Sequence, residues 1–346
     1  TVNLPLFFVG LFPKEQYWRT WCILSLLAGL SGLSWGVLLR QQAPLFSKTV
    51  LIGLALSALL IALTPITGVY RFMLTSITLA LILLAWLGKW LRQYLTRVRV
   101  GLGVAWFACL LAMLWLMRGG FGLAVVPSDR WGGLLLTCLI TIVSALTCFP
   151  LGILLALGRR SQLPVVKWLS VLYIELIRGV PLITILFMGQ VMVPMVFPPG
   201  VRPDRILRAM IGLTLFSAAY MAENIRGGLQ AIPRGQFEAA QALGLNSALT
   251  TILVVLPQAL KISIPAMVNQ FIGIFQNTTL LAIVGLVEFL GIARSILAQP
   301  EFIGRYSEVY LFVGVISWLL CCGMSMGSRR LETTLNRDSE TQYSRL

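Results

Sequence analysis

Residues 238–257 read EAAQALGLNSALTTILVVLP, a polar and helix-prone stretch between long apolar runs. Its alanines favour a slim helix, and Gly244 stands where a left-handed glycine closes a helix at its C′ position. Asn246 or Ser247 can then N-cap a second short helix, which Pro257 terminates or bends. The stretch therefore predicts two short helices that are joined at Gly244.

The composition around this stretch is that of an integral membrane protein. Of the 346 residues, 58% are hydrophobic and 11% are charged, whereas a soluble domain needs about 25% charged residues. Several apolar runs reach the ~18 residues with which a helix crosses the hydrocarbon core. We therefore expect an all-α, polytopic fold.

The run pattern predicts nine membrane crossings. A division near residues 127–129 separates four crossings from the five that follow, which predicts an N-terminal extension (1–127), a five-helix domain (128–330) and a C-terminal tail (331–346). The nine crossings are expected at residues 21–39, 45–64, 72–87, 102–117, 131–157, 168–193, 206–222, 262–284 and 306–327.

The net charge of +15 is explained by topology, because basic residues gather in cytoplasmic loops. With nine crossings and an outside start, 17 of the 27 basic residues fall inside, together with residues 238–257 and the C-terminus. An outside start fits better if one more crossing precedes Thr1. No polar segment combines a basic stripe with interleaved aromatics, so nucleic-acid binding is not expected.

The side chains of catalysis and metal binding are scarce. The chain has no histidine, which removes the commonest general base and the commonest metal ligand. All six cysteines lie in apolar stretches without a CxxC spacing, and we interpret most of them as small buried residues. A vicinal redox pair at Cys321 and Cys322 is the weaker alternative. We expect no catalytic residue, no cofactor and no metal.

From residue 131 to the C-terminus, the chain resembles the polar amino-acid branch of binding-protein-dependent ABC importer permeases, and within it the larger subunit of the general L-amino-acid type. The extra N-terminal crossings also suit that subunit. The sequence departs from the family at Gln276-Asn277, where relatives carry Lys-Asp. The segments that carry the resemblance are 131–134 (WGGL), 150–152 (PLG), 157–160 (LGRR), 174–175 (IE), 178–184 (RGVPLIT), 219–223 (AYMAE), 226–233 (RGGLQAIP), 238–257, 257–261 (PQALK) and 269–272 (NQFI).

The resemblance implies a type I permease core whose cytoplasmic coupling loop, residues 223–261, receives a separate ATPase. It also implies a homologous second permease, a periplasmic amino-acid-binding protein, an amino-acid substrate and a place in the bacterial inner membrane. The chain has no GxxxxGK[ST] phosphate loop, so a partner chain must hydrolyse ATP. An ordinary amphipathic surface helix is the alternative for the loop. The residues expected to couple are Glu238, Ala239, Ala240, Gly244, Leu256 and Pro257.

Two pairs of charged residues stand near the cytoplasmic ends of crossings. Glu175 and Arg178, like Glu223 and Arg226, are three residues apart and can pair on one helix face. Glu175 and Arg178 are equally well interpreted as part of a gate or as a structural ion pair. Glu223 and Arg226 are expected to support the coupling loop.

The remaining polar residues within crossings are candidates for a substrate path, because an amino acid stripped of water needs polar partners. Hydrogen bonding between helices is the alternative for each of them. The candidates are Gln190, Asn269, Gln270, Gln276, Asn277, Thr278 and Thr279.

Three other functions remain open on the sequence. A secondary transporter driven by ions or protons needs acidic residues at mid-membrane, whereas the acids within these crossings cluster near cytoplasmic ends. A membrane enzyme is disfavoured by the missing histidine and missing acid clusters. A scaffold subunit is harder to exclude.

Overall fold

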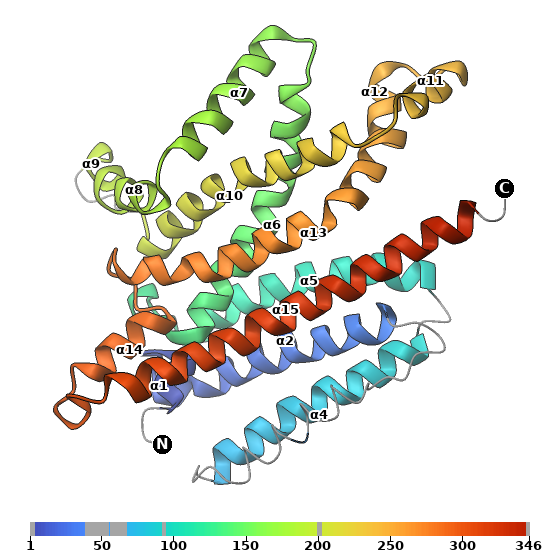
Figure 1. Ribbon diagram of the computed structural model, residues 1–346. Coiled ribbons are helices and arrows are strands. Elements are labelled where there is room, and N and C mark those ends of the chain that lie inside the picture. Colours follow the sequence, from blue (N-terminus) through green and yellow to red (C-terminus); the bar gives the residue numbers. More distant parts are fainter. Residues whose placement is uncertain (1–3, 39–54, 56–67, 92–94, 199–202, 344–346) are drawn as a thin grey trace. The chain divides into compact units, whose positions relative to one another are not determined.

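The computed structural model describes residues 4–38, 55, 68–91, 95–198 and 203–343. Those residues form helices joined by short loops, and their only strand-like feature is a single bridge between Gly120 and Leu123. The all-α prediction is therefore confirmed. Figure 1 shows the elements along the chain.

The helices divide between two compact units, residues Thr1–Leu135 and Leu136–Leu346, with α6 running from the first into the second. The first unit contains α1 (Leu4–Val9), η1 (Lys14–Gln16), α2 (Tyr17–Leu38), α4 (Gly68–Leu91), α5 (Leu95–Arg118) and η3 (Ser128–Arg130). From α6 onward the elements are α6 (Gly133–Arg159), α7 (Pro164–Gly179), α8 (Leu182–Phe187), η4 (Met188–Met192), α9 (Val193–Val196), α10 (Arg205–Gln230), α11 (Arg234–Ala242), α12 (Ser247–Leu249), η5 (Thr250–Val255), α13 (Leu256–Asn277), η6 (Thr278–Ala282), α14 (Phe289–Leu297), η7 (Pro300–Phe302) and α15 (Tyr306–Tyr343).

Seven helical segments of the described chain are long and apolar enough to cross a membrane. An eighth is possible if α7 and the α8–α9 segment form one span, although the two are bent by 103° at their break. Pro181 is the N-cap of α8 at this break, where a proline disfavours helical backbone at the residue before it. Apart from residue 55, the expected crossing at 45–64 lies outside the described residues, and the count of nine is not confirmed.

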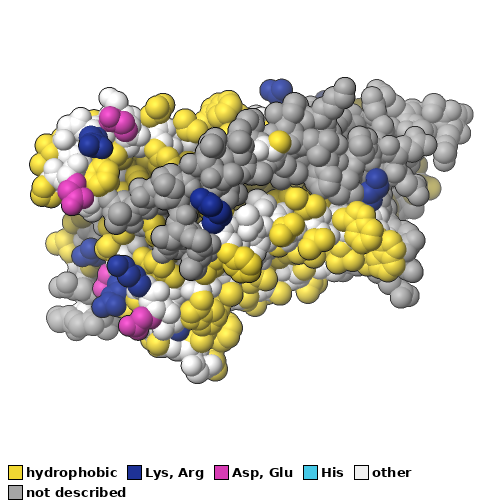
Figure 2. Space-filling model, turned by 90° about the horizontal axis from the view of Figure 1, so that it is seen from below, with side chains coloured by type: hydrophobic (Ala, Val, Ile, Leu, Met, Phe, Trp, Pro, Cys, Tyr) yellow, Lys and Arg dark blue, Asp and Glu magenta, His cyan; other side chains and the backbone are white. Residues whose placement is uncertain are grey.

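The surface of the described residues is rich in large apolar side chains, as a bilayer requires. Trp86, Trp90, Trp168 and Trp318 are all exposed, and Figure 2 shows hydrophobic side chains spread widely over one face, with few charged ones among them. Among the cysteines, Cys109 and Cys148 are buried as expected. Cys22 is exposed and the other three are half-buried, so the interpretation of most cysteines as buried residues is wrong.

Glycines set the closest helix contacts within each unit. In the first unit, a Cβ added at Gly36 of α2 would overlap the backbone of Ala85 in α4, and one at Gly88 of α4 would overlap Leu33 of α2. In the second unit, a Cβ at Gly228 of α10 would overlap Ser263 and the carbonyl of Ala259 in α13. The helix backbones approach this closely only because no side chain separates them.

Candidate coupling site

The stretch around Gly244 has the predicted helix–glycine–helix geometry. The φ of Gly244 is +82°, and the amide of Leu245 donates to the carbonyl of Ala240 at 3.2 Å while the amide of Gly244 donates to Gln241 at 2.9 Å. This 6→1 and 5→2 pair of hydrogen bonds is a Schellman motif. The Asn246 side chain accepts from the Leu249 amide at 2.9 Å, so Asn246 is the N-cap of α12. The structure thus confirms Gly244 as the C′ residue of α11.

The second half of the stretch differs from expectation. Pro257 does not end a short helix, because α12 continues through the π-helical residues Thr250–Val255 directly into α13. Pro257 directly follows the π-helical turn, and a proline inside a continuous helix removes one backbone hydrogen bond. The wider π turn therefore joins the loop helix to the crossing in one continuous segment, 247–282.

The residues of the stretch separate into an inner and an outer set. Ala240 is buried, as are Thr250 and Val255. Glu238, Ala239 and Pro257 are exposed, Leu256 is half-buried, and Leu243 is 83% exposed at the turn between the helices. Among the residues expected to couple, Ala240 therefore roots α11 in the protein, and the exposed ones are available to another chain.

Two contacts attach α11 to its surroundings, through Phe237 and Gln236, and a third joins Arg160 to α10. The Arg160 guanidinium lies 5.8 Å from the ring centre of Phe237 in α11 and donates to the carbonyl of Leu229 at 3.4 Å. Gln258 of α13 donates to the side-chain oxygen of Gln236 in α11 at 3.0 Å. These contacts connect α11 with Arg160 after α6 and with α13, and Arg160 with α10.

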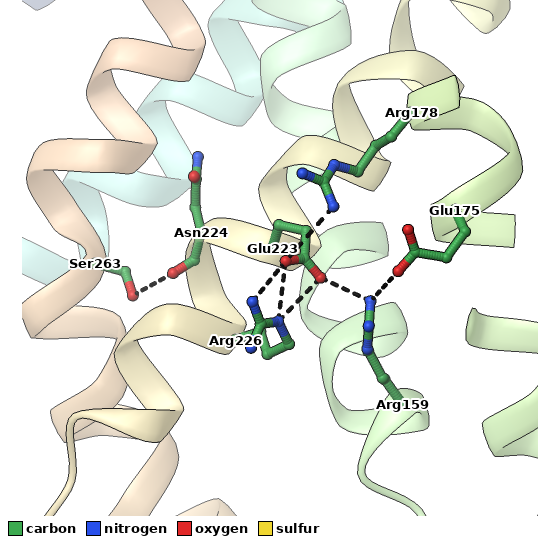
Figure 3. A network of polar contacts seen from close by, with 7 residues as sticks. All are labelled: Arg159, Glu175, Arg178, Glu223, Asn224, Arg226 and Ser263. Carbon is green, nitrogen blue, oxygen red and sulfur yellow. Dashed lines mark hydrogen bonds and ion pairs between the residues drawn. The ribbon is translucent and has the colours of Figure 1, made fainter. Parts of the chain in front are cut away.

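A network of ion pairs lies near the end of α10 that leads to α11 (Figure 3). We call Arg159, Glu175, Arg178, Glu223 and Arg226 the ion-pair network. Glu223 is its centre and accepts from Arg159 at 2.8 Å and from Arg226 at 2.8–3.0 Å, with Arg178 at 3.6 Å. Arg159 also pairs with Glu175 at 2.9 Å. The network thereby connects α6, α7 and α10.

The network corrects one of the two predicted pairs. Glu223 and Arg226 pair as expected, but Glu175 and Arg178 do not pair with each other. Glu175 instead binds Arg159, and Arg178 lies beside Glu223, with its guanidinium 5.6 Å from the ring centre of Tyr220. The reason is that α6 delivers the guanidinium of Arg159 between α7 and α10, and this tertiary partner replaces the local one.

The exposed fractions of the side chains indicate which members of the network depend most on their ion pairs. The Glu223 side chain is 14% exposed, whereas that of Glu175 is 54% exposed. Two charges in water gain little from pairing, while a poorly hydrated carboxylate depends on its partners. Glu223 is therefore the residue that holds the three guanidinium groups together.

The predicted substrate-path residues fall into three environments. Asn269 and Gln276 of α13 are both exposed, and their spacing of seven places them on one helix face. Gln190 lies in the π-helical residues of η4 and donates to the carbonyl of Arg205 at 2.8 Å. Thr278 is buried and donates to the carbonyl of Phe275 at 2.6 Å. Thr279 is exposed and donates to the carbonyl of Gln276 at 2.8 Å.

Asn269, Gln276 and Thr279 are therefore the exposed members of the predicted path. Gln276 also lies 3.9 Å from the sulfur of Cys321 on α15. Gln270 and Asn277 are half-buried. The role of all of these residues in a path stays a prediction.

Sequence reasoning missed several buried or half-buried charges, among them Arg159 and Glu288. Arg159 stands in the last turn of α6, where a cation also interacts favourably with the helix dipole. Glu288 is fully buried and caps α14 by accepting from the amides of Leu290 and Gly291 at 2.8 and 2.9 Å. Burial raises the pKa of the Glu288 carboxyl to about 7, although these hydrogen bonds lower it. An acid directly before the apolar run 289–293 was the available signal for this cap.

Known proteins share both the sequence and the fold of this chain. Residues 148–335 match the family model of the binding-protein-dependent transport system inner membrane component. The chain is 47% identical over 227 residues to the inner membrane amino-acid ABC transporter permease protein YhdY of Escherichia coli (strain K12), across 65% of this chain and 62% of YhdY, which is less than two thirds of that relative.

This chain covers a larger share of the length of two further proteins. The glutamate/glutamine/aspartate/asparagine transport system permease protein BztC of Rhodobacter capsulatus is 41% identical over 364 residues, across 96% of this chain and 77% of BztC. A crystal structure of an amino acid ABC transporter with histidines superposes with a TM-score of 0.53 and 29% identity, across 58% of this chain and 92% of that one.

Proposed function

Because the chain belongs to the family of binding-protein-dependent transport system inner membrane components, we propose that it is a membrane-spanning subunit of an amino-acid importer driven by a separate ATPase. The proposed substrates are polar L-amino acids, a class supported by the names of YhdY and BztC. The family disfavours the ion-driven alternative. Under this proposal, the chain conducts substrate and an ATPase supplies the energy.

The proposed docking element for the ATPase is the pair α11 and α12 with Gly244 between them. The observation that supports it is the division of this element into a buried root at Ala240 and an exposed outer surface at Glu238, Ala239 and Leu243. Small exposed side chains let a partner surface approach closely, and Leu243 offers an apolar contact at the turn. Leu256 and Pro257 would act from the base of the element, where it joins α13.

The proposed transmission of force follows the contacts of α11. A docked ATPase that moves α11 displaces the end of α10 through the short connection 231–233, and α13 through Gln258. The ion-pair network would then keep α7 attached to α6 and α10 or release it. ATP can shift these arrangements only by binding one of them more tightly than the other.

The proposed assembly contains a homologous second permease, the ATPase subunits and a periplasmic amino-acid-binding protein. The chain would be a multi-pass protein of the bacterial inner membrane, with residues 223–261 and the C-terminus in the cytoplasm. Residues 128–330 would form the permease domain and residues 1–127 an extension with about four crossings. Asn269 and Gln276 are the members of the proposed substrate path that α13 presents on one face.

The experiment is uptake by the whole importer in vesicles. Gly244→Asp and Glu238→Arg are expected to insert normally and to lose ATP-dependent uptake, because both alter the exposed side of the docking element. Glu301→Arg is the matched control, since it makes the same charge change at an exposed acid in η7, outside the docking element. Uptake that is unchanged in both docking variants would overturn the proposed coupling.

A second measurement separates the energy sources. Uptake by the proposed importer should require ATP on the side of the membrane where Gly244 lies. It should survive collapse of the proton gradient. Loss of uptake with the gradient, at constant ATP, would instead indicate a secondary transporter.

A further inference from the structure

The loop after α5 presents one aromatic side chain at the tip of a tight turn. Gly120 and Leu123 exchange backbone hydrogen bonds at 2.9 and 3.2 Å, which leaves Phe121 and Gly122 as the two central residues of the turn. Both have positive φ, 50° and 92°, as a type I′ turn requires. The Phe121 side chain is 98% exposed.

Phenylalanine is a poor residue for this backbone. Phe121 is the only residue other than glycine with positive φ in the described chain, and a bulky side chain in that conformation is strained. Asn, Asp or Gly would form the same turn at lower cost. The turn therefore does not explain the aromatic ring, and the ring must be explained by what it contacts.

The base of the loop is fixed. The Val126 amide donates to the carbonyl of Arg118 at 2.9 Å, and the Gly119 amide donates to Trp115 at 2.7 Å. Buried Arg19 of α2 donates to the carbonyl of Ala124 at 2.8 Å. The turn is thus held in place by the segments on both sides of it, so Phe121 projects from a rigid support.

The surroundings of Phe121 have the composition of a membrane interface. Phe121 stands three residues after Arg118, where α5 and its candidate membrane span end. Trp115 is exposed and donates its indole N–H to the carbonyl of Gly120 at 3.1 Å, and Val125 is 68% exposed. Arg118 and Arg130 are exposed and supply positive charges on either side of Phe121 in the sequence. Aromatic rings and basic side chains at the ends of spans are typical of the lipid headgroup level.

We propose that residues 119–125 are an interfacial lipid anchor, in which Phe121 inserts at the boundary between phospholipid headgroups and acyl chains. Trp115 and Val125 lie against the same layer, and Arg118 and Arg130 bind lipid phosphates. The anchor fixes the end of α5, and through Arg19 the start of α2, at a set depth in the bilayer. This role does not depend on the transported substrate.

The test is photochemical crosslinking of the full chain in its native membrane. Phe121→p-benzoylphenylalanine keeps an aromatic ring at an exposed position, and mass spectrometry identifies what the excited group has bonded to. The expected product is a phospholipid adduct. Val125→p-benzoylphenylalanine is a second variant in the same loop and should give the same product, should the first fold poorly.

Leu243→p-benzoylphenylalanine is the matched control, because Leu243 is also an apolar residue at an exposed turn, in the proposed docking element. The lipid adduct at position 121 is expected to exceed that at 243 several-fold. An adduct of position 121 with a protein, in this chain or another, would overturn the proposal in favour of a docking contact. Absence of any adduct at both 121 and 125 would overturn it in favour of an aqueous loop.

Discussion

Both units have close glycine contacts between helices, and the second unit also holds helices together by ion pairs. In the first unit, α2 and α4 meet backbone to backbone at Gly32, Gly36 and Gly88, with no room for a single methyl group. In the second unit, α6, α7 and α10 are connected near their ends by the ion-pair network. Both devices bring helices together, but they act through different atoms.

The difference concerns how each contact can change. A glycine contact has one close-packed arrangement, and it is lost if the helices slide. Ion pairs between long side chains can exchange partners, because Glu223 has three arginines around it and Arg159 has two acids. We infer that the α2–α4 contact is built to stay fixed and that the ion-pair network of the second unit is built to rearrange.

The largest effect is expected from a methyl group in the glycine contact. Gly36→Ala should lower the free energy of unfolding by about 3 kcal/mol, because its Cβ meets backbone atoms of α4 that cannot rotate away. Gly103→Ala in α5 is the control, since its Cβ meets nothing within 4 Å, and it should gain up to about 1 kcal/mol in helix propensity. Denaturation of the purified chain in detergent measures both. Equal midpoints for the two variants would contradict the fixed arrangement.

Removing the central carboxylate tests the other device. Glu223→Gln should cost about 2 kcal/mol, because it weakens charged hydrogen bonds to Arg159 and Arg226 at a poorly exposed site. Glu175→Gln changes the same functional group where it is 54% exposed and should cost about 0.5 kcal/mol. Chemical denaturation measures stability, and uptake measures coupling. If Glu175→Gln had the larger effect, Glu223 would not be the centre of the network.

A smaller effect is expected at Gly244 of the proposed docking element. Gly244→Ala should destabilise the Schellman motif by about 1 kcal/mol, because φ is +82° there although nothing lies within 4 Å of the new Cβ. Gly235→Ala in the same helix α11 also meets nothing but has no positive φ, so it should be neutral or slightly stabilising. Hydrogen exchange of the amides at 244 and 245 measures the local opening. Equal exchange in both variants would show that the conformation of Gly244 is not what holds the turn.

These contrasts also show what the sequence could predict. The Gly244 turn, the Asn246 cap and the Glu223–Arg226 pair depend on residues a few positions apart, and local rules find such features. The pairing of Glu175 failed because its partner, Arg159, comes from another helix. Spacing within one helix carries no information about which helix arrives beside it.

The glycine contacts and the exposed Phe121 could not be predicted from the sequence either, for a different reason. Gly32 and Gly36 have the small-xxx-small spacing of close helix contacts, but the spacing alone does not say that α4 is the partner. Phe121 reads as one apolar residue among glycines. Its positive φ and its exposure became visible only with the backbone in place.

The smallest effect is expected at that tip, and it separates conformation from contact. In detergent, Phe121→Asn should be more stable than Phe121→Ala by about 0.5 kcal/mol, because Asn tolerates the left-handed backbone that Ala, like Phe, does not. Both variants remove the ring, so any lipid contact is lost equally, and denaturation midpoints measure the difference. Equal midpoints would mean that the turn at 121 relaxes freely, unlike the glycine contact between α2 and α4, and that the first unit is fixed in its helices but not in this loop.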